Sequence, residues 1–292
     1  MKKNKKFTGS INGKIRFYDD FVEKHYLNES SIRGYDREKN FYVISRGLGL
    51  KNVPNLIRFD DKKKVITISR IFANKVQKCS DAYLASFVNF INKINEKSHD
   101  GGIIKATEAS TNAADIHMFI EERVGRFSNE GTSRSAQNLF KLSEQYLFEV
   151  CSVKGDFGGD ILSPSDNGIH NCLYGDGLFY FIDFEYSGLD TYTKLFYDFI
   201  LHPANLIDIS NFEKIYKTCR KEISNFEVRF DRGLIRLFSA WWIIRLLNSV
   251  SENTIEARKK IGTIKGVEVD QYIQQRLETV RYFIGIYNKC IG

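Results

Sequence analysis

The residues best suited to do chemistry lie close together in the second half of the chain. Asp166 and Asn171 stand five positions apart within Ser163-Pro-Ser-Asp-Asn-Gly-Ile-His-Asn-Cys-Leu173, and Asp183 ends an apolar run after a turn at 174–177. Carboxylate and amide oxygens, together with substrate phosphates, are the ligands that Mg²⁺ prefers. Two Asp and one Asn across a hairpin therefore predict a site for a hard cation, with Asp166 left free to orient and deprotonate an attacking hydroxyl.

Each of these patterns also has an ordinary interpretation. Asp183 alone could cap a turn, but the spacing of Asp166 and Asn171 favours a site. His170-Asn-Cys172 has no second pair of metal ligands, which indicates a loop histidine. The segment from Gly9 to Lys14 has three residues between its glycines, where a phosphate-binding P-loop has four, and no Ser or Thr follows the lysine. Both departures disfavour a P-loop.

The first seventy residues predict a small antiparallel sheet with one helix. Lys14–Tyr18 and Phe21–Tyr26 are short runs rich in aromatic and β-branched residues, separated by two aspartates. Helical spacing follows over Ser31–Leu48. Two more strands are expected at Asn55–Phe59 and Val65–Arg70, on either side of a charged turn.

From Ser80 onward the pattern is mostly helical. A Gly-punctuated β segment interrupts it at Ile161–Asp190, and a crossover is expected near Ile71–Val76. The predicted class is α+β, with a small lobe over 1–72 and a helical catalytic and acceptor-binding lobe over 73–292. The helices are expected at Tyr83–Ile94, Asp115–Arg126 and Ala136–Val150, and near Thr193, Asn211, Gly233 and Val269.

Composition narrows the class of protein. The 292 residues are 42% hydrophobic and 27% charged, which excludes a disordered chain and is enough for two lobes. A net charge of +7 is too small to predict a nucleic-acid partner. Five scattered cysteines without a C-x-x-C pair indicate reduced thiols of a cytoplasmic protein. Leu234–Val250 contains both tryptophans and two arginines, which predicts a buried helix and no membrane span.

The motif D-x-x-x-x-N at 166–171, followed by Ile182-Asp-Phe-Glu185, resembles the catalytic and metal-binding loops of the aminoglycoside phosphotransferase and choline kinase superfamily. The resemblance extends to Ala106–Ser110, Lys194–Pro203 and the helix around Trp242–Asn248. The S-P-S-D-x-G-x-H-N form is similar to uncharacterised phosphotransferase-family members. The resemblance implies a two-lobed, protein-kinase-like fold.

Residue by residue, the resemblance implies that Asp166 is the catalytic aspartate. Asn171 and Asp183 would hold Mg²⁺, and Glu185 would assist at the metal or the acceptor. The sequence departs from the family at Pro164, where the family often has a histidine two residues before the catalytic aspartate. This departure puts the geometry of the catalytic loop in question more than its chemistry.

The resemblance also implies a nucleotide site in the amino-terminal lobe. Lys24 would pair with the α- and β-phosphates and Glu38 would hold Lys24, although a lone strand lysine is more often simply solvated. Gly9–Gly13 stands where the family has its phosphate-covering loop, and the adenine would lie against the crossover near Ser69–Phe72. The further nucleotide-contacting residues are therefore Ser10, Asn12, Gly13, Ser69 and Ile71.

The predicted activity is ATP- and Mg²⁺-dependent phosphorylation of a hydroxyl on a small molecule, with ATP preferred over GTP. The first acceptor class is a sugar or sugar derivative of cell-surface polysaccharide biosynthesis. An amino-alcohol kinase is second, because Phe184-Glu-Tyr-Ser187 resembles choline and ethanolamine kinases, and an aminoglycoside phosphotransferase is third. A nucleotide-binding pseudokinase and a nucleic-acid binder remain as alternatives from other classes. The oligomeric state stays open.

Overall fold

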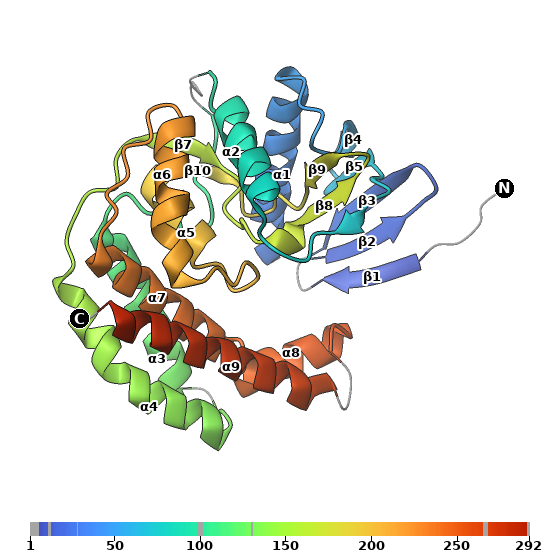
Figure 1. The fold of residues 1–292 in the computed structure, drawn as a ribbon. Helices are drawn as coiled ribbons and strands as arrows, with labels where there is room; N and C mark the ends of the chain where they lie inside the picture. Colours follow the sequence, from blue (N-terminus) through green and yellow to red (C-terminus); the bar gives the residue numbers. More distant parts are fainter. Residues whose placement is uncertain are drawn as a thin grey trace.

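The amino-terminal lobe is built on a five-stranded antiparallel sheet in the order β1-β2-β3-β5-β4 (Figure 1). In this computed structural model the described residues are 6–10, 13–27, 29–97, 102–129, 131–264 and 268–290. The strands are β1 (Lys6–Ser10), β2 (Gly13–Phe17), β3 (Phe21–Tyr26), β4 (Leu56–Asp60) and β5 (Val65–Ser69). Four of them match the predicted strands within a residue or two, and β1 was not predicted.

Helix α1 (Glu29–Gly47) covers one face of this sheet, and each of the two elements buries one row of side chains against the other. In β3 the buried side chains alternate, with Val22, Lys24 and Tyr26 on the inner face. In α1, Tyr35, Glu38, Phe41 and Tyr42 are fully buried at helical spacing. A lysine and a glutamate therefore share this small core with aromatic rings.

The chain leaves the sheet through β6 (Asn74–Lys75), which pairs antiparallel with β8 (Cys172–Gly175) of the large lobe. β8 in turn pairs with β9 (Leu178–Phe181), and the turn between them is Asp176-Gly177. Both turn residues have positive φ, 50° and 73°, as a two-residue hairpin requires. This hairpin brings the end of β9 back toward the loop before β8.

The large lobe is mostly helical, in agreement with the predicted fold class. Its helices are α2 (Asp81–Ile94), α3 (Ala113–Asn129), α4 (Arg134–Glu149), α5 (Tyr192–Ile200), α6 (Phe212–Glu222), α7 (Arg232–Asn248), α8 (Glu252–Ile261) and α9 (Glu268–Lys289). A two-stranded pair, β7 (Asp160–Ser163) with β10 (Gly188–Thr191), lies among them. Short 3₁₀ turns occupy Val150–Ser152, Ile169–Asn171 and Ile209–Asn211.

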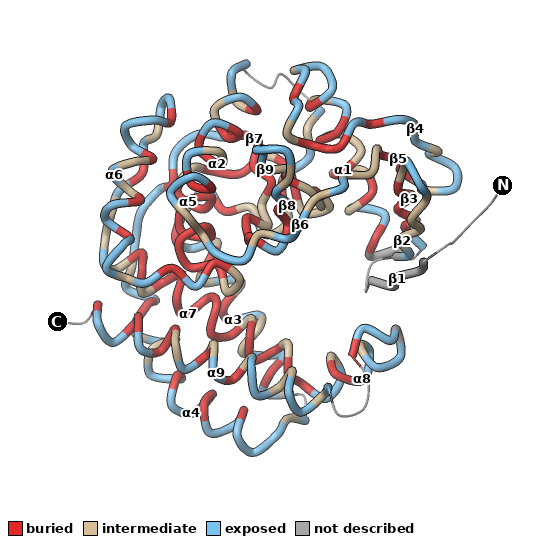
Figure 2. Tube along the Cα trace, turned by 45° about the vertical axis from the view of Figure 1, so that its right-hand side comes forward, coloured by how far each residue is buried: buried red, intermediate tan, exposed pale blue. Residues whose placement is uncertain are grey.

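Helix α7 is the centre of the large lobe. It packs against α3, α4 and α9, and Figure 2 shows it buried along most of its length. Asp231 caps its first turn by accepting a hydrogen bond from Leu234 N at 3.1 Å. Trp241 and Trp242 are both buried, which confirms the predicted buried helix. In the part of the chain that the structure describes, no helix is both long and apolar enough to cross a membrane.

Candidate functional site

The loop between β7 and β8 carries Asp166 and Asn171 and is folded by its own hydrogen bonds. Ser165 has φ 66° and its N–H donates to Ser163 Oγ at 3.0 Å, while Asp166 N donates to Pro164 O at 2.9 Å. Asn171 Nδ2 donates to Asp166 O at 3.2 Å. These bonds fold the segment onto itself, so Asp166 and Asn171 lie on one small loop.

Asp166 accepts hydrogen bonds from two histidines. His202 Nε2 lies 2.8 Å from Asp166 Oδ1, and His170 Nε2 lies 3.4 Å from Asp166 Oδ2. Ala204 N donates to His202 Nδ1 at 3.0 Å, so the proton of the neutral ring is on Nε2 and points to the carboxylate. Burial raises the pKa of Asp166, but the bonds from His170 and His202 outweigh it and hold the pKa well below its usual value.

The sequence did not predict His202. It lies just beyond α5 and 36 positions from Asp166, with no spacing that marks it as a partner. Asn205 fixes this segment to the loop, since its Oδ1 accepts from Ile169 N at 2.8 Å and its Nδ2 donates to Phe199 O at 2.8 Å. His202 therefore holds the Asp166 carboxylate through a contact that the local sequence motif does not contain.

Gly168 allows the two imidazole rings to lie against the loop. A Cβ at this position would lie 2.4 Å from His202 Cε1. The ligand atoms of Asp166, His170 and His202 also lie within 4.8 Å of one another, close enough to share one cation. Two nitrogens and one oxygen suit Zn²⁺ better than Mg²⁺, so this cluster is separate from the predicted Mg²⁺ ligands.

A second cluster joins the two lobes. Lys24 Nζ lies 2.8 and 2.6 Å from the two carboxylate oxygens of Glu38 and 2.6 Å from Asp183 Oδ1. Tyr26 OH donates to Glu38, and Phe184 N donates to Glu38 Oε1 at 3.3 Å. The structure thus contains the ion pair between Lys24 and Glu38 and brings Asp183 to it from the end of β9.

Burial and charge act in opposite directions on Lys24. Burial lowers the pKa of its amine, but the carboxylates of Asp183 and Glu38 outweigh that effect and raise the pKa well above its usual value. Lys24 is consequently a fixed cation between the lobes. A fixed ammonium at this place suits phosphate groups.

The backbone at Asp183 is in the left-handed region, with φ 67°, which is uncommon for a residue with a Cβ. The next residue, Phe184, stacks on Phe41 of α1 at 3.9 Å between ring centroids and lies edge-on to Tyr42. The aromatic contact anchors the segment in the core. Because Phe184 is held there, Asp183 projects toward Lys24.

Asn171 and Asp183 fit a Mg²⁺ ion by their chemistry. Ile182 N donates to Asn171 O at 3.0 Å, which ties the residue before Asp183 to the loop that carries Asp166. An amide oxygen and a carboxylate are both hard ligands that leave room for water and phosphate oxygens. Glu185, the third predicted metal residue, lines a cavity of about 340 Å³ together with Arg33 and Arg37.

The remaining predicted nucleotide residues lie at the ends of strands. Ser10 and Gly13 face each other as the last pair of the β1–β2 hairpin, and Asn12 lies outside the described residues. Ser69 ends β5, where its Oγ accepts from Asn55 N at 2.8 Å. Ile71 follows in the half-buried crossover. Their contacts with a nucleotide stay predictions.

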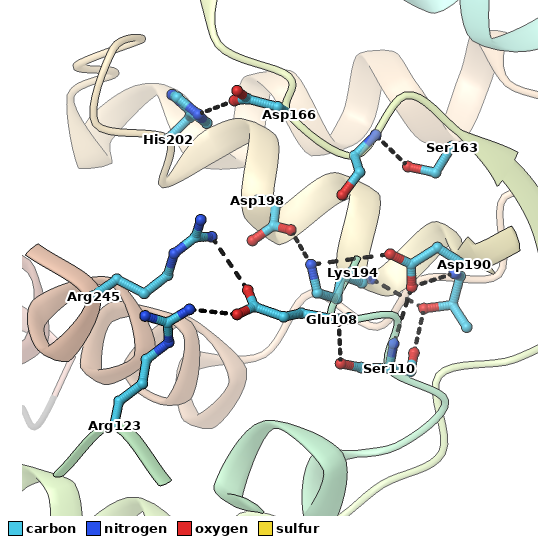
Figure 3. A network of polar contacts seen from close by, with 12 residues as sticks. Glu108, Ser110, Arg123, Ser163, Asp166, Asp190, Lys194, Asp198, His202 and Arg245 are labelled. Atoms are coloured by element: carbon cyan, nitrogen blue, oxygen red, sulfur yellow. Dashed lines mark hydrogen bonds and ion pairs between the residues drawn. The ribbon is translucent and has the colours of Figure 1, made fainter. Parts of the chain in front are cut away.

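A network of buried charges lies next to Asp166 (Figure 3). Lys194 is fully enclosed, pairs with Asp198 one turn along α5 and lies 3.9 Å from Asp190. Burial raises the pKa of Asp190 to about 6, although Lys194 and two backbone N–H groups act against that rise. This network connects β10, α5 and the segment before α3 next to the loop that carries Asp166.

Comparison with known proteins places the fold. No protein-family model matches the chain, and no curated protein matches it in sequence. A choline/ethanolamine kinase family protein from Mesorhizobium loti superposes with a TM-score of 0.62 at 9% identity, over 99% of this chain and 92% of that one. The GDP complex of aminoglycoside 2'-phosphotransferase-IIIa gives 0.61 at 12%, over 98% and 93%.

A third solved structure, spectinomycin phosphotransferase in complex with ADP and spectinomycin, gives a TM-score of 0.57 at 12% identity, over 100% of this chain and 93% of that one. All three relatives match over nearly their whole length. The chain therefore has the two-lobed kinase-like fold that the loop motifs predicted. At these identities the likeness concerns the fold, and the activity is argued from the site.

Proposed function

We propose that the protein is a phosphotransferase that moves the terminal phosphate of a nucleoside triphosphate to a hydroxyl of a small molecule. The observation that carries the proposal is the arrangement of Lys24, Glu38 and Asp183 next to a loop that holds Asp166 and Asn171. This set supplies a cation for phosphates, hard ligands for Mg²⁺ and a carboxylate for the acceptor. All of these groups are needed for phosphoryl transfer.

The contacts support a role for each of these residues. Lys24, held by Glu38, would bind the non-transferred phosphates, and Asn171 with Asp183 would hold Mg²⁺, which supplies charge neutralisation to the phosphate oxygens. Asp166 would accept the hydrogen bond of the attacking hydroxyl and align its oxygen. Its low pKa makes it a weak base, which suits a reaction that depends mostly on positioning.

The residues 1–72 would form the nucleotide lobe and 73–292 the catalytic and acceptor lobe. ATP is the first expected donor and GTP the second, and the related structures contain ADP in one case and GDP in another. The acceptor is expected to be a sugar or sugar derivative. The reported relatives are named for choline or ethanolamine and for aminoglycosides, so the predicted polysaccharide pathway gains no support from them.

The first experiment measures thermal stability with and without Mg²⁺ and each nucleotide, because it requires no knowledge of the acceptor. A ligand at about 100 times its Kd stabilises a protein by about 2.7 kcal/mol, which raises Tm by several degrees at this chain length. We expect a Mg²⁺-dependent shift that Asp183→Asn removes. Asp166→Asn should keep the shift but lower kcat by about 10²–10⁴ once an acceptor is found.

Asp81→Asn is the matched control, since the Asp81 side chain is 83% exposed and forms an ion pair with Lys214 at the surface. It should leave the shift unchanged. Absence of a shift with both ATP and GTP would contradict the proposal and favour a degenerate kinase-like scaffold that does not bind nucleotide. Near wild-type turnover in Asp166→Asn would overturn the role given to that residue.

A further inference from the structure

A cavity of about 640 Å³ lies beside Asp166 in the large lobe. Its walls come from the loop that carries Asp166, the segments before α3 and after α5, and helices α3, α5, α7, α8 and α9. Trp242 of α7, Arg258 of α8 and Arg276 of α9 line it together with Asp166. Its volume suits a molecule of sugar size.

The carboxylates of this cavity already have partners. Glu108 pairs with Arg123 and lies 3.7 Å from Arg245, as Figure 3 shows, and Asp198 pairs with Lys194. Asp166 accepts hydrogen bonds from His170 and His202. Five Arg or Lys side chains line the cavity against three carboxylates, so positive charge remains after pairing.

That remaining charge is on Arg258 and Arg276. The two guanidinium carbons lie 5.1 and 5.0 Å from the centroid of the Tyr272 ring, so both arginines stack on one tyrosine. Within the described part of the chain, no carboxylate lies within ion-pair distance of either arginine. Two like charges held close together in a cavity favour an anion between or beside them.

Buried donors in the same cavity also lack acceptors. The Trp242 side chain is only 7% exposed, and its Nε1 has no hydrogen-bond partner among the described residues. The Tyr272 hydroxyl and Arg258 Nε are buried and unpartnered in the same sense. One acceptor atom, Asp198 Oδ1, is also unpartnered. A ligand that satisfies this set brings several acceptor oxygens and at least one hydroxyl.

We infer that the acceptor of this site is a hydroxylated small molecule that carries a phosphate or a carboxylate, bound through Arg258 and Arg276. The inference rests on the proposed phosphotransferase function, because it names the substrate class of that same site. Arg–phosphate and Arg–carboxylate pairs are the strong, orienting hydrogen bonds that such a cavity offers. They would hold the anionic end while a hydroxyl lies at Asp166.

The same charges act against the two cationic acceptor classes. Choline and the aminoglycosides are positively charged, and each would have to approach two unpaired arginines in a partly enclosed cavity. Like charges brought together without counter-ions lower affinity. The amino-alcohol and aminoglycoside alternatives are therefore disfavoured by the cavity that the structure shows.

The test is a binding titration that needs no turnover. The two tryptophans of the chain are neighbours in α7 and Trp242 lines the cavity, so their fluorescence reports occupancy, with calorimetry as a second readout. The probes are glucose 6-phosphate, glucuronate, glucose and choline. We expect at least one anion to bind at least about tenfold more tightly than glucose and choline; the phosphate and the acid distinguish the two anion types.

The double variant Arg258→Gln/Arg276→Gln should weaken that anion at least about tenfold. Arg281→Gln is the matched control, because Arg281 is an exposed arginine of the same helix α9 outside the cavity, and it should leave the affinity unchanged. Equal affinity for glucose or choline, an unchanged Kd in the double variant, or no anion binding below about 10 mM would each overturn the inference.

This titration and the thermal-stability experiment together separate the two proposals. Loss of the Mg²⁺–nucleotide shift with intact arginine-dependent anion binding would refute the phosphotransferase and leave an anion site without that activity. A normal nucleotide shift with no selectivity for anions would keep the phosphotransferase and refute the anionic acceptor.

Discussion

Asp166 illustrates how a single carboxylate depends on its neighbours. Its low pKa reflects hydrogen bonds from His170 and His202 that outweigh the effect of burial. An ionised Asp166 is present above its pKa and is lost as the pH falls through it. Because that pKa is well below its usual value, kcat/KM of the wild type should show no acid limb from Asp166 above about pH 4.

Removal of His202 tests this dependence. Burial raises the pKa of Asp166, and in His202→Ala only His170 remains to lower it. The pKa of Asp166 should therefore rise, and the acid limb of kcat/KM should move to higher pH. The pH–rate profile of a productive acceptor measures the shift. His25→Ala, whose side chain contacts Glu23 on the other face of β3 from Lys24, should leave the profile in place. An unchanged profile in His202→Ala would contradict the assignment.

At this scale the sequence predicted the residues that share a local motif and missed those that meet through the fold. Asp166 and Asn171 are five apart, and one loop brings them together. His202 reaches Asp166 only because of the path of α5, and no interval in the sequence encodes that path. Arg258 and Arg276 are ordinary helix arginines until α8 and α9 place both against Tyr272.

Helix α5 and strand β10 share a buried charge that stabilises their junction. Lys194→Met would leave Asp190 and Asp198 without their cation, and removal of one partner from a buried ion pair costs about 3–5 kcal/mol. Urea unfolding should show a decrease of that size at pH 7. The decrease should become smaller toward pH 5. Asp190, whose pKa is already about 6, takes up a proton there and no longer needs the lysine as its counter-ion.

Lys217→Met is the comparison for this element. Lys217 also pairs with a carboxylate four residues away, Glu213 of α6, but the pair is exposed. Its removal should change the free energy of unfolding by less than about 0.5 kcal/mol. Equal losses in the two variants would show that burial of the Lys194 pair has no special effect.

Elements with a clear period could be predicted from the sequence, and those without one could not. Strand β3 was placed at its observed ends because its side chains alternate. Helix α8 was missed because the run Glu-Asn-Thr-Ile-Glu-Ala-Arg-Lys-Lys-Ile contains few apolar residues, of which Ile255 is buried. Strand β1 was missed because its glycine and serine are typical of a loop and its pairing with β2 stabilises it.

The two lobes share one continuous core across the whole molecule. Phe184 lies at the junction, stacked on Phe41 and close to Phe90. The wild type should therefore unfold in one transition, with coincident midpoints by far-UV circular dichroism and by the fluorescence of α7 tryptophans. Phe184→Ala should lower the free energy of unfolding by about 3–5 kcal/mol.

Phe148→Ala is the control for that substitution, since Phe148 is 77% exposed on α4. Its effect should stay within about 0.5 kcal/mol. Two separate transitions in the wild type would show that the lobes unfold independently, and a small effect of Phe184→Ala would show that this ring does not join them.

The contact between Lys24 and Asp183 has a consequence for how strongly two ligands would depend on each other for binding. In the free protein the Lys24 ammonium is shared by the carboxylates of Glu38 and Asp183, so one negative charge of this cluster stays uncompensated. A metal alone would compete with Lys24 for Asp183, and a triphosphate alone would draw Lys24 away and leave Asp183 repelling the new anion. When both bind, the metal would compensate Asp183 after Lys24 has moved away, and the triphosphate would compensate Lys24 after Asp183 has bound the metal. Under the proposed function Lys24 and Asp183 would exchange partners when both ligands bind, and metal and nucleotide would raise each other's affinity by the same factor.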